Sequence, residues 1–320
     1  MSAIFTIYAA QGGTVMNKAV CKAAEKSGCT VIYDGLLRDY TTFRVGGSCC
    51  IIKLNGAEAC SELVRLLKEN NEPYYILGRG SNIIADDKGV NGTVLLIGNL
   101  MSDKRVEDDI IYCDAGATLT ALCNTALDNG LAGAEFAYGI PGTVGGAVYM
   151  NAGAYGGEIK DIILYAEAVN RETGELKRFT PEEMELSYRH SRFMKNDYII
   201  TSAAFKLEKG DKTEIRAKMD ELMEKRRSKQ PLEYPSAGST FKRPEGSYAS
   251  LLIEQCGLKG YAVGGAEVST KHSGFVINKN NASFDDIMQL IEDVKKIVEE
   301  KTGYKLECEP VIMSDKKQGV

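Results

Sequence analysis

The sequence has few of the side chains that bind metal ions in clusters. It contains two histidines, His190 and His272, and its nine cysteines include no C-x-x-C pair. Zinc sites need thiolates or imidazoles that lie close together. We therefore expect no metal site. Scattered cysteines of this kind usually behave as small apolar residues in a reducing compartment.

Long apolar runs and an excess of positive charge are missing as well. No segment reaches the roughly 18 apolar residues of a membrane span, and the first residues lack the pattern of a signal peptide. The 39 basic and 44 acidic residues give a net charge of −5, which disfavours nucleic acid or an anionic membrane as a partner. We therefore expect a cytoplasmic protein with neither partner, and we expect a monomer.

The usual nucleotide-binding spacings are absent too, although the chain has 33 glycines. Neither glycine cluster follows the G-x-G-x-x-G pattern or ends in Gly-Lys-Ser/Thr. The first cluster, residues 78–82, follows a short apolar stretch. The second, residues 139–157, has seven glycines in nineteen residues. The usual dinucleotide and nucleoside-triphosphate folds are therefore disfavoured.

So many glycines favour a backbone that lies against a ligand. Each one costs conformational entropy on folding, and glycines after a strand let the backbone aim N–H groups at phosphate oxygens. For residues 78–82 an ordinary surface turn is an equally good interpretation, since short glycine turns are common. For residues 139–157 the density exceeds what turns need.

The apolar pattern predicts a mixed α and β chain. Helices are expected at residues 17–27, 57–69, 119–129, 211–229 and 284–302. Strands are expected at residues 30–33, 49–54, 74–77, 94–97, 110–115, 162–170, 176–179 and 198–207, and a hairpin turn at 171–174. The character changes near Gly210, which predicts a domain boundary there. Residues 1–15 have little pattern, and we expect them to form an extension outside the fold.

Six motifs carry a resemblance to a known family. They are Thr42-Phe43-Arg44-Val45-Gly46-Gly47, the 78–82 loop, the 139–157 segment, Tyr188-Arg189-His190-Ser191-Arg192-Phe193, Gly238-Ser239-Thr240-Phe241-Lys242-Arg243-Pro244 and Leu306-Glu307-Cys308-Glu309. In this order and spacing the chain resembles the UDP-N-acetylenolpyruvoylglucosamine reductases of peptidoglycan synthesis, from about Asp39 to Glu309. The short 231–239 connection is similar to that of the second type of the family, which lacks an insertion over the substrate.

The resemblance implies an α+β fold and a flavin reaction. It implies an FAD-binding domain of the vanillyl-alcohol-oxidase-like (PCMH) class at residues 16–209, with subdomains at about 16–80 and 81–209. A C-terminal α+β substrate domain would follow at 210–320. It also implies noncovalent FAD, NADPH as the hydride donor, and UDP-N-acetylglucosamine enolpyruvate as the nucleotide-sugar acceptor, which would be reduced to UDP-N-acetylmuramate.

Three residues match the catalytic positions of the family. Arg189 would bind the substrate carboxylate and stabilise the enolate, because a planar guanidinium suits a carboxylate. Glu309 would polarise and orient that end of the substrate, with a bound water or as a protonated acid. Ser239 would donate the proton, which requires a very basic intermediate or a neighbouring cation that lowers its pKa.

The resemblance also implies the binding residues. For the cofactor these are Arg44, Gly46, Gly47, Gly78, Arg79, Gly80, Ser81, Asn82, Ile83, Gly139, Pro141, Gly142, Thr143, Gly145, Gly146, Ala147, Asn151 and Gly153. For the substrate they are Tyr188, Arg226, Lys229, Lys242 and Arg243. The chain departs from many relatives at Arg79, at Arg243, where they carry asparagine, and at Pro310-Val311, where they often carry Val-Arg.

Two other functions stay open at this point. An oxidase of the same fold often tethers FAD through a histidine, but His190 lies in the catalytic motif and is poorly placed for that. A noncatalytic nucleotide-sugar or flavin-binding protein would be expected to lose Ser239, Arg189 or Glu309, and all three are present.

Overall fold

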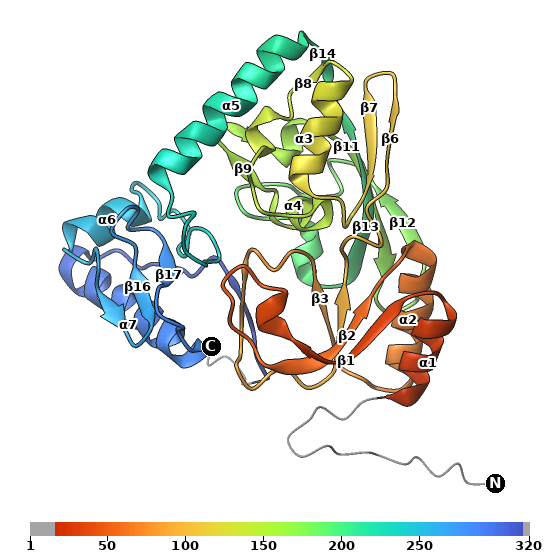
Figure 1. The fold of residues 1–320 in the computed structure, drawn as a ribbon, viewed down its shortest axis with the longest axis horizontal. Helices are drawn as coiled ribbons and strands as arrows, with labels where there is room; N and C mark the ends of the chain where they lie inside the picture. Colours follow the sequence, from red (N-terminus) through yellow and green to blue (C-terminus); the bar gives the residue numbers. More distant parts are fainter. Residues whose placement is uncertain (1–16, 316–320) are drawn as a thin grey trace.

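The computed structural model describes residues 17–315 and shows three packed units in chain order (Figure 1). The chain combines helices with mainly antiparallel sheets, as expected for the predicted α+β class. The extension predicted at residues 1–15 lies outside the described residues. Within 17–315, no helix combines the length and the apolar character that a bilayer crossing requires.

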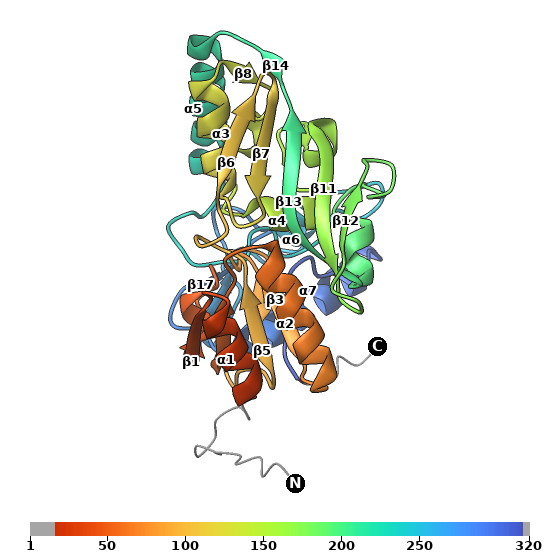
Figure 2. The ribbon, with the colours of Figure 1, turned by 90° about the vertical axis from the view of Figure 1, so that its right-hand side faces the viewer.

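The first unit is a four-stranded mixed sheet with two helices on one side (Figure 2). The strand order is β1-β2-β5-β3, with β2 parallel to β5 and β5 parallel to β3. Its elements are α1 (Lys18–Lys26), β1 (Thr30–Leu36), β2 (Ser48–Lys53), α2 (Ala57–Glu69), β3 (Tyr74–Leu77) and β5 (Thr93–Leu96). Helix α2 and strand β3 confirm the predicted bounds, because their apolar residues follow a clear period.

The second unit is built on a five-stranded antiparallel sheet in the order β12-β11-β13-β7-β6. Its strands are β6 (Lys104–Glu107), β7 (Ile110–Asp114), β11 (Ile163–Asn170), β12 (Leu176–Phe179) and β13 (Tyr198–Lys206). Helices α3 (Leu119–Asp128) and α4 (Val144–Met150) pack on this sheet. Short pairs β8–β14 and β9–β10 complete it, at Leu131–Ala132 with Glu208–Lys209 and at Gly153–Ala154 with Gly157–Glu158. The predicted hairpin between β11 and β12 is confirmed.

Helix α5 (Lys212–Lys229) leads from the second unit to the third (Figure 1). The third unit has a three-stranded antiparallel sheet covered by two helices. Its elements are α6 (Ala249–Gln255), β15 (Ala262–Val263), β16 (Ala266–Val268), β17 (Val276–Asn278) and α7 (Phe284–Thr302). Helix α7 has the predicted bounds: Ser283 and Asp286 form its capping box, and Gly303 ends it with φ 77°.

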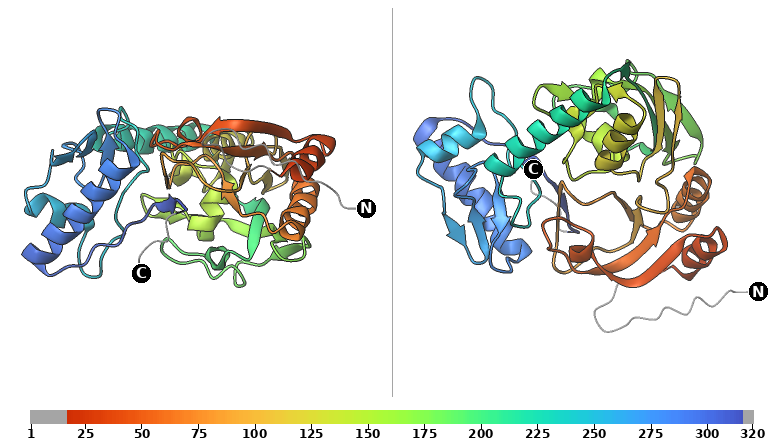
Figure 3. Two further views of the ribbon diagram at one scale, coloured as in Figure 1. Left: turned by 90° about the horizontal axis from the view of Figure 1, so that it is seen from below. Right: turned by 45° about the horizontal axis from the view of Figure 1, so that its top comes forward.

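The hydrophobic cores do not coincide with the three units, because each of two cores contains residues from more than one unit. One core joins the first two units and includes Ile215 and Met219 of α5. A second joins α6 and α7 to Phe43 and Val45 from the first unit. The last strand, β18 (Val311–Met313), pairs in parallel with β4 (Ile83–Ala85). Figure 3 shows the blue C-terminal segment running back from the third unit toward the rest of the chain. The N-cap of α5 lies next to the domain boundary predicted near Gly210, and the division into functional domains stays a prediction.

Candidate active site

A large cavity lies where the three units meet. Its volume is about 1490 Å³, and it is lined by the 78–83 loop, the start of α4, the 230–239 connection after α5, and Glu309. Pockets for one small ligand usually measure about 300–1,000 Å³. The cavity therefore has room for an extended cofactor together with a substrate.

The two glycine-rich segments meet in this cavity. A Cβ atom on Gly78 would lie 2.7 Å from the Thr143 hydroxyl oxygen, and one on Gly80 would lie 2.2 Å from the Tyr40 carbonyl. Gly80 also has φ 63°, which a side chain would strain. Only glycine permits the first loop to lie this close to the start of α4 and to residues 40–41.

Most of the residues predicted to bind the cofactor line the cavity. They are Arg44, Gly78, Arg79, Gly80, Ser81, Asn82, Ile83, Gly139, Pro141, Gly142, Thr143, Gly145, Gly146, Ala147 and Gly153. Gly46, Gly47 and Asn151 are not among the lining residues. A Cβ on Gly47 would lie 2.1 Å from the Asp87 carbonyl, and one on Gly46, which has φ 129°, would lie 2.6 Å from the Leu37 Cβ. Packing inside the chain is therefore sufficient to explain these two glycines.

The 139–157 segment contains a helix that the sequence analysis did not predict. Residues 144–150 form α4, whose N-cap Thr143 accepts a hydrogen bond from Gly146 N–H. Gly145 brings this helix against β7, because a Cβ there would lie 2.9 Å from the Ala115 Cβ. Gly157 likewise packs on Phe136. Some of the glycines therefore serve packing, and others leave backbone open to the cavity.

The lining fits a flavin dinucleotide. Glycine backbone forms one wall, and apolar side chains such as Leu119 and Ile140 contribute to the rest. Arg44 and Arg79 also line the cavity, both are exposed, and neither makes an ion pair with a described residue. Cations and backbone N–H groups beside an apolar wall suit a diphosphate joined to an aromatic ring system.

Backbone pairing brings two of the predicted catalytic residues to the cavity. Residues 240–242 run antiparallel to 307–309, with Glu309 N–H donating to the Thr240 carbonyl at 2.9 Å and Lys242 N–H donating to the Glu307 carbonyl at 2.9 Å. Ser239 comes just before this pairing, after Gly238 with φ 78°, and is exposed to the cavity. The pairing therefore brings Ser239 and Glu309 to one wall.

Arg189 joins them from the second unit. Its Nε donates to Glu309 Oε1 at 3.0 Å, and its Nη2 donates to the Gly153 carbonyl at 3.3 Å. The two side chains are only 23% and 11% exposed. Burial raises the pKa of Glu309, and the positive charges of Arg189 and Lys242 oppose that rise without cancelling it.

Arg226 is the buried cation of the cavity. It is 6% exposed, its Nη1 donates to Gln230 at 3.0 Å, and its Nε has no hydrogen-bond partner among the described residues. Burial lowers its pKa, against the weaker opposing effect of Tyr155. A buried guanidinium with a spare donor is suited to an anionic ligand. The sequence had pointed to Arg226 but not to Tyr155, whose ring lies 5.9 Å from the guanidinium carbon.

The other residues predicted to bind substrate lie outside the lining. Lys229 is exposed at the end of α5, and Lys242 pairs with Glu307 at 3.2 Å. The Arg243 guanidinium carbon lies 4.6 Å from the centre of the Tyr248 ring and 5.9 Å from that of Tyr188. His190 is exposed and does not line the cavity either. Val311, at a position where relatives often carry arginine, begins β18 and lines the cavity.

Among residues 17–315, no group of three or more His, Cys, Asp or Glu side chains is arranged to hold a metal ion. The described cysteines are all free thiols, and burial is the largest cause that raises the pKa of several of them, Cys60 and Cys113 to about 12. Arg189, Glu309 and Ser239 are three polar groups that the structure brings to the cavity.

Comparison with known proteins identifies close relatives. The family model for the C-terminal domain of UDP-N-acetylenolpyruvoylglucosamine reductase matches residues 230–313, and an FAD-binding domain model matches residues 49–180. The chain is 49% identical over 284 residues to a UDP-N-acetylenolpyruvoylglucosamine reductase of Clostridium novyi, covering 88% of this chain and 92% of that one. It is 44% identical to the enzyme of the same name from Caldanaerobacter subterraneus, over 88% and 92% of the two chains.

A solved structure agrees. The crystal structure of UDP-N-acetylenolpyruvylglucosamine reductase from Thermus caldophilus superposes with a TM-score of 0.76 at 34% sequence identity. The match covers 89% of this chain and 99% of that one. The similarity therefore extends over all three units.

Proposed function

Since the chain belongs to the UDP-N-acetylenolpyruvoylglucosamine reductase family, we propose a division of labour among its cavity residues. The protein is an FAD-dependent oxidoreductase that uses NADPH to reduce UDP-N-acetylglucosamine enolpyruvate to UDP-N-acetylmuramate in peptidoglycan synthesis. The observation that carries the proposal is the meeting of Ser239 and the Arg189–Glu309 pair in a cavity lined by glycine loops. We also propose that it acts in the cytoplasm as a monomer.

The glycine loops and their neighbours hold the cofactor. Backbone N–H groups at 78–82 and near the start of α4 would hold the phosphates, and Arg44 and Arg79, which line the same cavity, would neutralise part of their charge. When bound, FAD takes a hydride from NADPH and supplies it to the methylene carbon of the enolpyruvyl group. The protein residues then have two tasks: they stabilise negative charge at the adjacent carbon, and they supply a proton to it.

Arg189 stabilises the developing charge. Its Nε is occupied by Glu309, which leaves Nη atoms for the substrate carboxylate, into which the charge spreads. Glu309 fixes the guanidinium in this orientation. A substrate carboxylate placed nearby would raise the pKa of Glu309 further, because like charges repel. Glu309 is then more readily protonated and can donate a hydrogen bond to that end of the substrate.

Ser239 delivers the proton. The hydroxyl is a weak acid, so it can act only toward a strongly basic carbon held close to it. Its position, exposed to the cavity and next to the pairing that carries Glu309, supports this role. Arg226 binds the diphosphate of the nucleotide sugar. The outer part of the same ligand lies near Lys229, Tyr188, Lys242 and Arg243. Residues 210–320 accordingly form the substrate-binding domain.

The test uses Ser239→Ala in the FAD-loaded protein, with Ser228→Ala on the exposed face of α5 as the matched control. NADPH should reduce the flavin of both variants anaerobically, which is followed near ~450 nm. Reoxidation by the enolpyruvyl sugar should be about 10²–10⁴-fold slower in Ser239→Ala and unchanged in the control. Wild-type reoxidation in Ser239→Ala would remove Ser239 from the mechanism. Reoxidation by oxygen but not by the sugar would point to an oxidase instead.

A further inference from the structure

Asn151 ends α4 and is completely buried, with φ 42°. Its Nδ2 donates to the Ser187 carbonyl at 2.9 Å and to Glu158 Oε2 at 2.9 Å, and its Oδ1 accepts the Lys160 N–H at 2.9 Å. Every polar atom of the side chain is thus bonded to the chain itself, and the residue does not line the cavity. This differs from the cofactor-binding role that the sequence predicted for it.

The Ser187 carbonyl belongs to the turn that carries Arg189. Ser187 and His190 exchange two backbone hydrogen bonds of 3.1 Å across the two residues between them. Arg189 has φ 51° in this turn, a conformation that residues other than glycine adopt at a cost of about 1–3 kcal/mol. Surrounding contacts must therefore hold the turn in place.

The end of α4 supplies those contacts. Asn151 bonds to Ser187 on one side of the turn, and the Ser191 hydroxyl donates to the Tyr149 carbonyl at 2.7 Å on the other. Arg189 Nη2 reaches Gly153, just beyond the helix. Both anchors are buried, since Asn151 and Ser191 are each 0% exposed.

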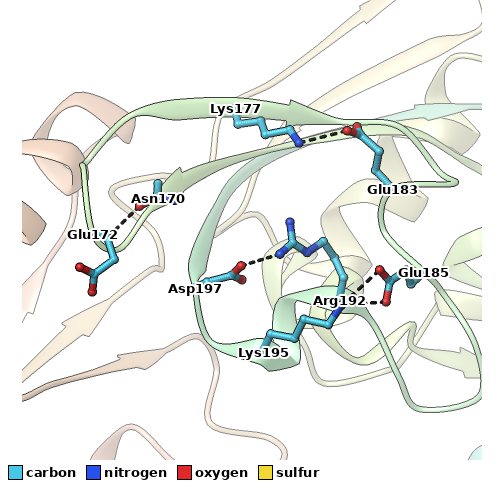
Figure 4. A network of polar contacts seen from close by, with 8 residues as sticks. All are labelled: Asn170, Glu172, Lys177, Glu183, Glu185, Arg192, Lys195 and Asp197. Carbon is cyan, nitrogen blue, oxygen red and sulfur yellow. Dashed lines mark hydrogen bonds and ion pairs between the residues drawn. The ribbon is translucent and has the colours of Figure 1, made fainter.

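The outer side of the same segment, residues 180–197, is held by weaker contacts. Figure 4 shows ion pairs from Lys177 to Glu183 and from Lys195 to Glu185, at 3.0 and 3.2 Å. Their side chains are about half exposed, and such pairs contribute about 0–1 kcal/mol each. The buried amide of Asn151 is therefore a stronger constraint on the turn than these two ion pairs, while the partly buried Arg192–Asp197 pair at 2.5 Å holds the end of the segment that follows the turn.

We infer that Asn151 is a positioning residue, which holds the Tyr188-Arg189 turn so that the Arg189 guanidinium can bond to Glu309 and the substrate at the same time. This inference rests on the role proposed for Arg189. Asn151 touches neither ligand, and its influence on the reaction passes through the turn. The orientation of Arg189 is thereby determined at the end of α4, the helix that forms part of the cofactor wall.

The experiment compares Asn151→Gly with Asn71→Gly in the FAD-loaded protein. Glycine accepts the positive φ at both positions and removes the side chain, and Asn71 is an exposed asparagine with φ 51° that does not line the cavity. In Asn151→Gly we expect FAD affinity to change by less than about twofold and reoxidation by the enolpyruvyl sugar to slow by about 10–100-fold. Asn71→Gly should change neither quantity. Loss of FAD binding in Asn151→Gly, or unchanged reoxidation, would overturn the inference.

A double-mutant cycle separates positioning from a general loss of structure. If Asn151 acts through Arg189, the double variant with Arg189→Ala should reoxidise no more slowly than Arg189→Ala alone. Additive losses would show that Asn151 acts by another route. If Arg189→Ala itself keeps the wild-type rate, the role proposed for Arg189 fails first. If Arg189→Ala reoxidises slowly while Asn151→Gly keeps the wild-type rate, only the positioning role of Asn151 fails and the role of Arg189 stands.

A second variant covers the case in which Asn151→Gly does not fold. Asn151→Asp retains the shape and the acceptor for Lys160 but loses the N–H donor to Ser187. It is expected to bind FAD and to show the same slow reoxidation. Normal reoxidation at a pH that ionises the new carboxyl, which lies beside Glu158, would contradict the inference, because an ionised carboxyl has no hydrogen to donate to Ser187 whereas a protonated one does.

Discussion

The Arg189–Glu309 pair owes its character to partial burial. At the surface, such a pair would contribute little and would leave both groups fully ionised. Here the carboxylate is mostly withdrawn from water, and burial raises its pKa in spite of the guanidinium at 3.0 Å. Any change that brings negative charge nearby therefore raises the pKa of Glu309 further. An arriving substrate carboxylate is such a change.

This raised pKa predicts a pH-dependent stability difference for Glu309→Gln. In the unfolded chain Glu309 ionises at its ordinary pKa, so the folded state binds the proton more tightly. Glu309 consequently costs no stability at low pH and lowers the free energy of unfolding as pH rises through the pKa of the folded state. Glutamine keeps an acceptor for Arg189 without that cost.

Urea unfolding from about pH 4 to about pH 8 checks the prediction. The free energy of unfolding of Glu309→Gln should rise relative to the wild type with increasing pH. Glu307→Gln removes an exposed carboxylate two residues earlier and controls for net charge. A difference that stays flat or falls with pH for Glu309→Gln would mean that burial does not dominate at this position.

Individual elements differ in how well the sequence predicts them. Helices α2 and α7 were predicted residue for residue, because each has an apolar stripe with helical period and α7 has a capping box. Helix α4 was missed, because valine and two glycines begin it and glycine has a poor helix propensity. Its stability comes from packing of Gly145 on Ala115, a contact between residues thirty positions apart. Local sequence does not contain that information.

The candidate site likewise contains residues that the sequence predicts and residues whose role only the structure shows. The glycine loops and the motif residues Arg189, Ser239 and Glu309 could be named from the sequence, and the structure brings them to one cavity. The inward direction of Asn151 and the packing role of Gly47 could not, since each depends on which atoms lie opposite in the folded chain. Motifs indicate that a residue matters, and only the three-dimensional contacts indicate how.

At Arg226 of helix α5, we expect one substitution to increase the free energy of unfolding and to weaken substrate binding. This cation is buried without an ion-pair partner among the described residues, so replacing it with methionine should remove a desolvation cost. We expect Arg226→Met to unfold at equal or higher free energy, by about 1 kcal/mol. The KM for the nucleotide sugar should rise about 10–100-fold through loss of a charge-assisted hydrogen bond.

Arg227→Met is the matched control, because Arg227 is the next residue of α5 and is exposed. It should leave both quantities near their wild-type values. Urea unfolding gives the free energies of unfolding and steady-state kinetics gives the KM values of the wild type, Arg226→Met and Arg227→Met. A strongly destabilised Arg226→Met with an unchanged KM would show that Arg226 is structural and binds no diphosphate.

At the scale of the whole molecule, the loop of residues 40–47 connects the 78–82 glycine loop to Ser236 and to Asn278 of the third unit. Thr42 N–H donates to the Gly80 carbonyl at 3.1 Å, and Ser236 N–H donates to the Thr42 carbonyl at 3.2 Å. The Thr42 hydroxyl donates to the Ser236 carbonyl at 2.6 Å, and Asn278 donates to the Phe43 carbonyl at 3.2 Å. The return of β18 to β4 adds a second connection. The sites proposed for FAD and for the substrate therefore lie on parts of the chain that these contacts join.

Thr42→Val tests this coupling, because valine has nearly the same shape and lacks the hydroxyl. The variant loses the hydroxyl bonds to the carbonyls of Ser236, three residues before Ser239, and of Gly80, while the backbone bonds that join Thr42 to Gly80 and to Ser236 can persist. We expect the free energy of unfolding to fall by about 1 kcal/mol. The KM for the enolpyruvyl sugar should rise by up to about tenfold, the change that corresponds to ~1.4 kcal/mol, because the 236–239 segment loses an anchor.

Thr42→Ser separates the hydroxyl from the methyl group and should restore the wild-type KM. Unfolding and kinetic measurements on the two variants therefore distinguish three cases. A raised KM in Thr42→Val alone supports a connection that runs through the hydroxyl. A fall in stability with no kinetic change limits the bond to holding the units together. Equal defects in both variants would show that the hydroxyl alone does not carry the effect, because valine keeps the methyl group and serine keeps the hydroxyl. The coupling would then have to pass through β18 and the 40–47 backbone instead.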